Sequence, residues 1–162
     1  MYMLNKLKIF LKFDRKTKLL LLEAYLNLAW ARFLKLLPFA KLAPSLGKQM
    51  EETSSTLINA NKETLRSVSN AIHMMSKYTF WESQCLVKAI AAMKMLEKRG
   101  IESTLYLGTA KDEKGMLIAH AWLRSGPFYV SGSEGMEKFT VVSKFAKKMT
   151  ESQTKGVNDN GG

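Results

Sequence analysis

One cysteine and one histidine stand out as residues able to do chemistry together, namely Cys85 and His120. A cysteine thiolate is a strong nucleophile, and an imidazole accepts a proton near neutral pH. When the two are held together, the imidazole takes the thiol proton and the thiolate attacks an acyl group. Such a pair needs one element that presents Cys85 and a second element, carrying His120, that lies across it.

Residues 79–100 are expected to present Cys85 on a helix, because apolar residues recur there at helical spacing. Ser83 is the expected N-cap and Gly100 the expected C-terminal end. Cys85 then falls in the first turn, where unpaired N–H groups and the helix dipole stabilise a thiolate and can later bind an oxyanion. An alternative stays open, because Cys85 is also in register with the apolar face, where a cysteine serves as a small buried side chain.

After residue 100 the apolar pattern changes to alternation, which predicts strands over residues 103–108, 116–124 and 128–131. A tight turn before the third strand puts His120 of the second strand opposite Ser131, or opposite Gly132 if the turn is one residue longer. A group at that place can orient the imidazole. Packed on the helix of Cys85, these strands predict an α+β fold with an antiparallel sheet.

Two further helices are expected upstream. One runs from about residue 50 to 77. The other covers residues 18–39, starts at an Asp14 or Thr17 cap, and stops or kinks at Pro38. One face of this helix carries an apolar stripe made of Leu19, Leu22, Leu26, Ala29, Phe33 and Leu36.

The net charge of +11 is concentrated in residues 1–50, which hold ten basic and two acidic side chains. A membrane span is rejected because Glu23, Arg32 and Lys35 interrupt residues 18–39. Three roles stay open for this basic helix: packing on its own domain, docking a partner protein, or contacting an anionic membrane surface. Nucleic acid is not expected, because the basic residues alternate with leucine and no recognition motif is present.

Composition excludes several other classes. A length of 162 residues fits one domain. A single cysteine cannot form an intramolecular disulfide, which fits a reducing, cytoplasmic compartment. One cysteine and two histidines are too few for a structural zinc site, and no glycine-rich phosphate loop is present, so neither a metal nor a cofactor is expected. Lysines interrupt the N-terminal segment too often for a signal peptide.

Four short motifs resemble one known family. They are SQCL at 83–86, LEKRG at 96–100, STLYLGTA at 103–110 and AHAWLR at 119–124. Together they are similar to the leader peptidases of lasso-peptide gene clusters, which are called transglutaminase-like B proteins. The resemblance covers roughly residues 15–145, and it implies a papain/transglutaminase-like core in which the nucleophile helix packs on an antiparallel sheet.

The resemblance implies a cysteine protease that removes the leader from a ribosomally synthesised lasso-peptide precursor. By position, Cys85 is then the nucleophile and His120 the general base. The family usually carries an aspartate on the third strand that orients the histidine. Here Ser131, a backbone carbonyl or Glu134 is left for that role. Gln84 is a further candidate, as a donor to the oxyanion.

Three regions are expected: a basic amphipathic helical region (1–49), the cysteine protease core (50–148) and a flexible tail (149–162). The family's small leader-recognition domain is not expected before Cys85, so the chain resembles the split form. That form needs a separate leader-binding protein and an ATP-dependent cyclase. The expected location is the cytoplasm or the inner face of the membrane, which residues 18–39 would contact. A noncatalytic protease-like docking module, at the membrane or on the cyclase, and acyl transfer by the same thiol remain as alternative functions.

Overall fold

The computed structural model describes residues 12–56, 61–80 and 84–149 of the chain. Within these ranges, four α-helices and a five-stranded antiparallel sheet form the expected α+β fold. The helices are α2 (Arg15–Leu34), α3 (Phe39–Leu46), α4 (Lys62–Ser76) and α5 (Cys85–Glu97). The strands are β1 (Lys48–Gln49), β2 (Ser103–Lys111), β3 (Leu117–Ser125), β4 (Phe128–Ser131) and β5 (Thr140–Lys147), and a short 3-10 helix, η2 (Met136–Lys138), precedes β5.

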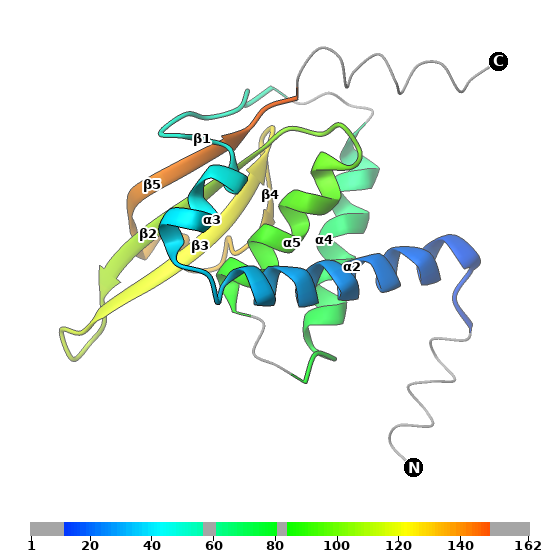
Figure 1. Ribbon diagram of the computed structural model, residues 1–162, viewed down its shortest axis with the longest axis horizontal. Helices are drawn as coiled ribbons and strands as arrows, with labels where there is room; N and C mark the ends of the chain where they lie inside the picture. Colours follow the sequence, from blue (N-terminus) through cyan, green and yellow to red (C-terminus); the bar gives the residue numbers. More distant parts are fainter. Residues whose placement is uncertain (1–11, 57–60, 81–83, 150–162) are drawn as a thin grey trace.

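The sheet has the order β1-β5-β2-β3-β4, so the last strand in sequence is inserted between β1 and β2. The helix α5 packs on β2, β3 and β4, while α4 packs beside α5 and against β4. The helix α2 crosses both α4 and α5, and α3 lies over β1 and β5 (Figure 1). The sequence predicted β2, β3 and β4 but not β1 or β5.

The core lies between the helices and one face of the sheet. Leu28 comes from α2, Val68 from α4 and Leu96 from α5, and all three are fully buried. The sheet contributes side chains that include Leu105, Leu123 and Phe145 to the same cluster. Burial of these large apolar side chains is the main term that holds α5 on the sheet.

The helix α2 starts at the expected Asp14 cap, whose carboxylate accepts hydrogen bonds from the N–H groups of Lys16 and Thr17. Its apolar stripe faces outward: Leu19 is 67% exposed and Leu26 is 58% exposed. The helix packs through the opposite face, whose buried residues are Leu21, Ala24, Asn27, Leu28 and Ala31. The two alanines let α2 approach α4 and α5 closely, which explains why this face is the buried one.

The helix expected from about residue 50 begins only at Lys62. Residues 51–56 instead form an irregular segment, and two side chains of the sheet bind its backbone at Thr53. The N–H of Thr53 donates to the Thr104 hydroxyl at 2.9 Å, and the carbonyl of Thr53 accepts from Arg124 at 3.1 Å.

The boundary expected at residue 49 stays a prediction. The helices α2 and α3 supply Leu28 and Leu46 to the same core as the elements that follow residue 49. Of the expected tail, residues 150–162 lie outside the described residues. In the described part of the chain, no helix is both long and apolar enough to cross a membrane.

Candidate active site

Cys85 is the first residue of α5, as the sequence predicted. The N-cap is Gln84, which has extended backbone angles, and the expected cap Ser83 lies outside the described residues. Gly100 follows the helix with a φ of 65°, the left-handed conformation that suits glycine at a helix end. The Cys85 side chain is half-buried and packs against the core. Cys85 therefore lies at the positive end of the α5 dipole, beside the backbone N–H groups of the first turn, a place suited to binding an oxyanion.

Gln84 connects the start of α5 to the end of α2. Its side-chain oxygen accepts a hydrogen bond from the ammonium group of Lys35, the C-cap residue of α2. This contact fixes the amide plane of Gln84 and brings a cation to the N-terminal end of α5. The expected role of Gln84 as an oxyanion donor stays a prediction.

The imidazole of His120 is held in place by one hydrogen bond and two aromatic rings. Its Nε2 atom lies 2.7 Å from the carbonyl oxygen of Gly132. The ring contacts Phe139, with centroids 4.9 Å apart, and Trp122, with centroids 5.8 Å apart. Because a carbonyl oxygen only accepts, Nε2 must carry the hydrogen, and in the neutral ring Nδ1 is then the proton acceptor. The geometry thus leaves Nδ1 as the basic atom.

Of the two residues expected opposite His120, Ser131 is wrong, because the turn falls at Gly126 and Pro127, one residue later than expected, and the register then shifts again; the carbonyl of the other, Gly132, contacts the ring. Ser131 pairs with Leu123, and the register changes between Leu123 and Arg124. The Ser131 hydroxyl is buried and has no hydrogen-bond partner, so it does not orient the ring. Glu134 is exposed and makes no hydrogen bond to His120. Of the three candidates for the group that orients the imidazole, the one that contacts it in the described residues is a backbone carbonyl, that of Gly132.

Two glycines lie beside His120 at positions where a Cβ would clash with neighbouring atoms. Gly132 has a φ of +72°, and a Cβ there would lie 2.3 Å from the carbonyl oxygen of Ala121. Gly108 pairs with His120 across β2 and β3, and a Cβ on it would come within 2.8 Å of the Trp122 ring. Neither position has room for a side chain, so the contacts of His120 depend on both glycines.

The aromatic contacts continue along the sheet from His120 to a buried arginine. Trp122 stacks on Tyr106 with centroids 5.7 Å apart, and the Tyr106 hydroxyl accepts from Arg124 at 2.9 Å. Burial raises the pKa of Tyr106, while the neighbouring Arg124 acts in the opposite direction. Arg124 also donates to the carbonyls of Thr53 and Gly126, so it ties three segments together.

The structure places Cys85 and His120 on contacting elements but does not join their side chains. Alternation along β3 puts His120 on one face with Trp122, and Ala121 on the other face with the helical core. Cys85 packs against that core. No hydrogen bond links the thiol and the imidazole in the described part of the chain.

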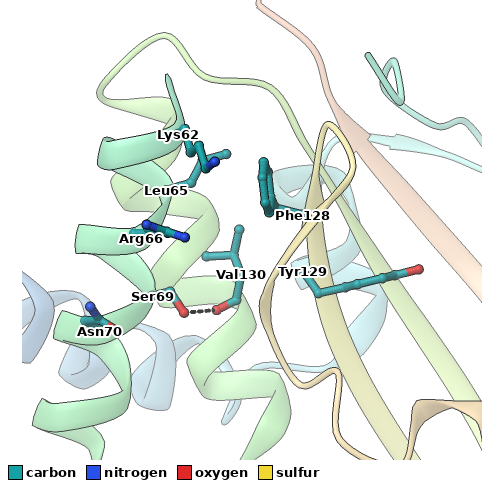
Figure 2. Close-up of a pocket in the computed structure, with 8 residues that line it drawn as sticks. All are labelled: Lys62, Leu65, Arg66, Ser69, Asn70, Phe128, Tyr129 and Val130. Carbon is teal, nitrogen blue, oxygen red and sulfur yellow. Dashed lines mark hydrogen bonds between the residues drawn. The ribbon is translucent and has the colours of Figure 1, made fainter. Parts of the chain in front are cut away.

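Two cavities lie away from these residues. A cavity of about 110 Å³ separates α4 from β4 (Figure 2), and a larger one of about 390 Å³ lies between α3 and β5. In Figure 2, the Ser69 hydroxyl closes one side of the first cavity through its hydrogen bond to the Val130 carbonyl. Neither cavity is lined by Cys85 or His120. Over the described residues, no cluster of three or more histidine, cysteine, aspartate or glutamate side chains could hold a metal ion.

Comparison with known families agrees with this architecture. The model of the transglutaminase-like superfamily matches residues 26–144, and the chain belongs to this superfamily. Its members generally include cysteine proteases and transglutaminases, which places the chain in a cysteine protease-like fold. No curated protein and no solved structure was found to match the chain.

Proposed function

We propose that this chain is a cysteine peptidase that removes the leader from a ribosomally synthesised lasso-peptide precursor. The observation that carries the proposal is the hydrogen bond from His120 Nε2 to the Gly132 carbonyl, which leaves Nδ1 as a proton acceptor. Cys85 at the first position of α5 supplies the nucleophile, and the superfamily supplies the precedent for the pair. The lasso-peptide substrate rests on the resemblance of the four motifs.

The proposed reaction has two steps. Nδ1 of His120 takes the thiol proton, and the thiolate of Cys85 attacks the carbonyl carbon of the last leader residue. Backbone N–H groups at the start of α5 stabilise the oxyanion. The C–N bond then breaks, and the departing amine takes the proton from Nδ1. Water, deprotonated by Nδ1, then attacks the thioester carbonyl. The C–S bond breaks, the Cys85 thiolate takes the proton back from Nδ1, and the leader leaves as a carboxylic acid. The described residues show no contact between the thiol and Nδ1, so the proposed reaction requires a rearrangement of the chain in solution that brings the two together.

The proposed partners follow from the split form that the chain resembles. A separate protein binds the leader and delivers the precursor, and an ATP-dependent cyclase consumes the freed core peptide. The proposed location is the cytoplasm or the inner face of the membrane.

Cleavage of a precursor peptide in the presence of its leader-binding protein, followed by mass spectrometry, tests the proposal. The wild-type chain is expected to release the leader at one bond, and Cys85→Ala to release none. His120→Gln is expected to cleave at least about a hundredfold more slowly, the usual size of a lost general base. His73→Gln, which changes an exposed histidine on α4, is the matched control and is expected to cleave at the wild-type rate. Equal cleavage by wild type and Cys85→Ala contradicts the proposal.

A noncatalytic docking module is the second candidate, and one observation favours it. The described residues show neither a hydrogen bond between Cys85 and His120 nor a carboxylate bound to the imidazole. A module of this kind would support peptide maturation equally well with Cys85→Ala.

The cleavage assay run with added amines separates hydrolysis from acyl transfer by the same thiol, because transfer leaves the amine on the leader.

A further inference from the structure

The side of α2 that faces away from the domain is apolar, which is unusual for a helix already packed in a core. We call it the α2 outer face and define it as Leu19, Leu22, Leu26, Trp30 and Phe33. Each of these side chains is between 51% and 67% exposed. The opposite side of α2 is buried against α4 and α5, so the helix needs no further packing from its own domain. Large contiguous apolar surface on a protein marks a site of interaction.

The apolar surface continues past the end of α2. Leu36 is 67% exposed, Leu37 is 39% exposed and Phe39 is 46% exposed. The rings of Trp30 and Phe33 stack with centroids 6.2 Å apart. Aromatic and leucine side chains on one side of a helix are typical of segments that lie in a membrane interface.

Cations surround the α2 outer face at both ends. The exposed cations Arg15 and Lys16 lie at the start of the face. Arg32 lies near its end, and exposed Lys41 follows that end. Only two acidic residues occur between residues 12 and 49, and both are engaged. Asp14 caps the helix, and Glu23 binds Arg99 at 2.6 Å. The surface around the face is therefore positive, and it is complementary to an anionic layer.

We infer that the α2 outer face binds an anionic lipid surface, with α2 lying parallel to the membrane. The apolar side chains enter the interface, and the flanking cations contact lipid phosphates. A lipid surface fits better than a second copy of this chain, because two such faces would bring like charges together. The inference does not depend on peptidase activity, and the experiment below involves no cleavage.

Co-sedimentation with lipid vesicles tests this inference. The full-length chain is expected to bind vesicles made of equimolar phosphatidylcholine and phosphatidylglycerol, and to bind pure phosphatidylcholine at least about tenfold more weakly. Added salt is expected to weaken the binding, because the cations act through screened electrostatics.

Two double variants separate the contribution of the apolar side chains to vesicle binding from that of the cations. Leu22→Gln/Leu26→Gln removes apolar contacts, and Arg15→Gln/Lys16→Gln removes charge. Each is expected to lower the affinity for anionic vesicles at least about tenfold. All four positions are exposed, so circular dichroism is expected to show an unchanged fold.

The turn between β2 and β3 and the strand ends that flank it supply matched controls. Met116→Gln/Leu117→Gln changes side chains that are 65% and 74% exposed, and Lys111→Gln/Lys114→Gln removes two exposed cations. Both controls are expected to bind vesicles like the wild type. The inference is overturned if the wild type does not bind anionic vesicles, if it binds neutral and anionic vesicles equally, or if the controls lose as much affinity as the α2 variants. It is also overturned if sedimentation without lipid shows self-association that the α2 variants abolish while vesicle binding is unchanged.

Discussion

Gly132→Ala tests whether the backbone carbonyl of residue 132 orients His120. Gly132 has a φ of +72°, and an added Cβ would lie 2.3 Å from the Ala121 carbonyl oxygen and 3.0 Å from the Trp122 Cα. Those neighbours are backbone atoms of β3 and cannot turn aside. The chain at residue 132 must therefore move, and the 2.7 Å hydrogen bond to His120 Nε2 is lost.

The expected cost has three parts. A residue with a Cβ in the left-handed region costs about 1–2 kcal/mol. Relief of the clash costs about 1–3 kcal/mol, and the lost hydrogen bond about 0.5–1.5 kcal/mol. Gly132→Ala is therefore expected to lower the free energy of unfolding by about 2.5–6.5 kcal/mol. Gly135→Ala is the matched control, since Gly135 has a φ of +73° and nothing within 4 Å of its Cβ position. It is expected to cost about 1–2 kcal/mol.

Urea denaturation measures both variants, and nitrogen NMR of the imidazole reports the tautomer of His120. The hydrogen is expected on Nε2 in the wild type and in Gly135→Ala, and on both nitrogens in exchange in Gly132→Ala. The reasoning is refuted if the two variants unfold with the same free energy and His120 keeps the same tautomer in both.

Two further predictions concern the ion pair between α2 and the C-terminal end of α5, and the packing beside His120. The hydrogen bond from Arg99 holds the pKa of Glu23 below its ordinary value of 4.5, against the opposing effect of burial. The stability that this carboxylate contributes is therefore present above pH 4.5 and is lost as the pH falls through the lower pKa of the folded state. Glu23→Gln is expected to unfold about 1–2 kcal/mol more easily than wild type at neutral pH, with the difference shrinking in acid. Urea titrations across this pH range check it, and a constant difference contradicts it. Gly108→Ala is expected to cost about 1–3 kcal/mol and to change the near-ultraviolet dichroism of Trp122, because its Cβ would lie 2.8 Å from that ring. Gly115→Ala, whose Cβ position is open, is expected to leave that spectrum unchanged, and an identical spectrum in both variants would count against the contact.

Local sequence signals predicted the elements that carry the site. The helical spacing after residue 84 and the position of Gly100 predicted α5 with Cys85 in its first turn. Alternation predicted β3, with His120 and Trp122 on one face. These signals are strong because each depends on residues close together in the chain.

The packing of α2 was not predictable in the same way. Both the leucine stripe and the stripe of Ala24, Leu28 and Ala31 recur at helical spacing, so the sequence offers two apolar faces. Close approach to α4 and α5 selects the face with the smaller side chains. That choice depends on neighbours that are distant in sequence.

Contacts distant in sequence also hid β5 and the partner of His120. The strand β5 carries Lys144 and Lys147, which reduce its apolar character, yet each lysine binds a glutamate of another segment. The turn at Gly126 and Pro127, together with the register shift between Leu123 and Arg124, places Ser131 opposite Leu123 and not opposite His120. The sequence pattern gives the positions of side chains only. It could not predict that the Gly132 carbonyl contacts His120 where the family usually has an aspartate.

The claim that His120 activates Cys85 is tested most directly by the rate at which the thiol is alkylated. The chain has a single cysteine, so incorporation of iodoacetamide reports on Cys85 alone. At neutral pH, the wild type is expected to react at least about tenfold faster than His120→Gln, while His73→Gln reacts like the wild type. Equal rates for the wild type and His120→Gln would contradict the account.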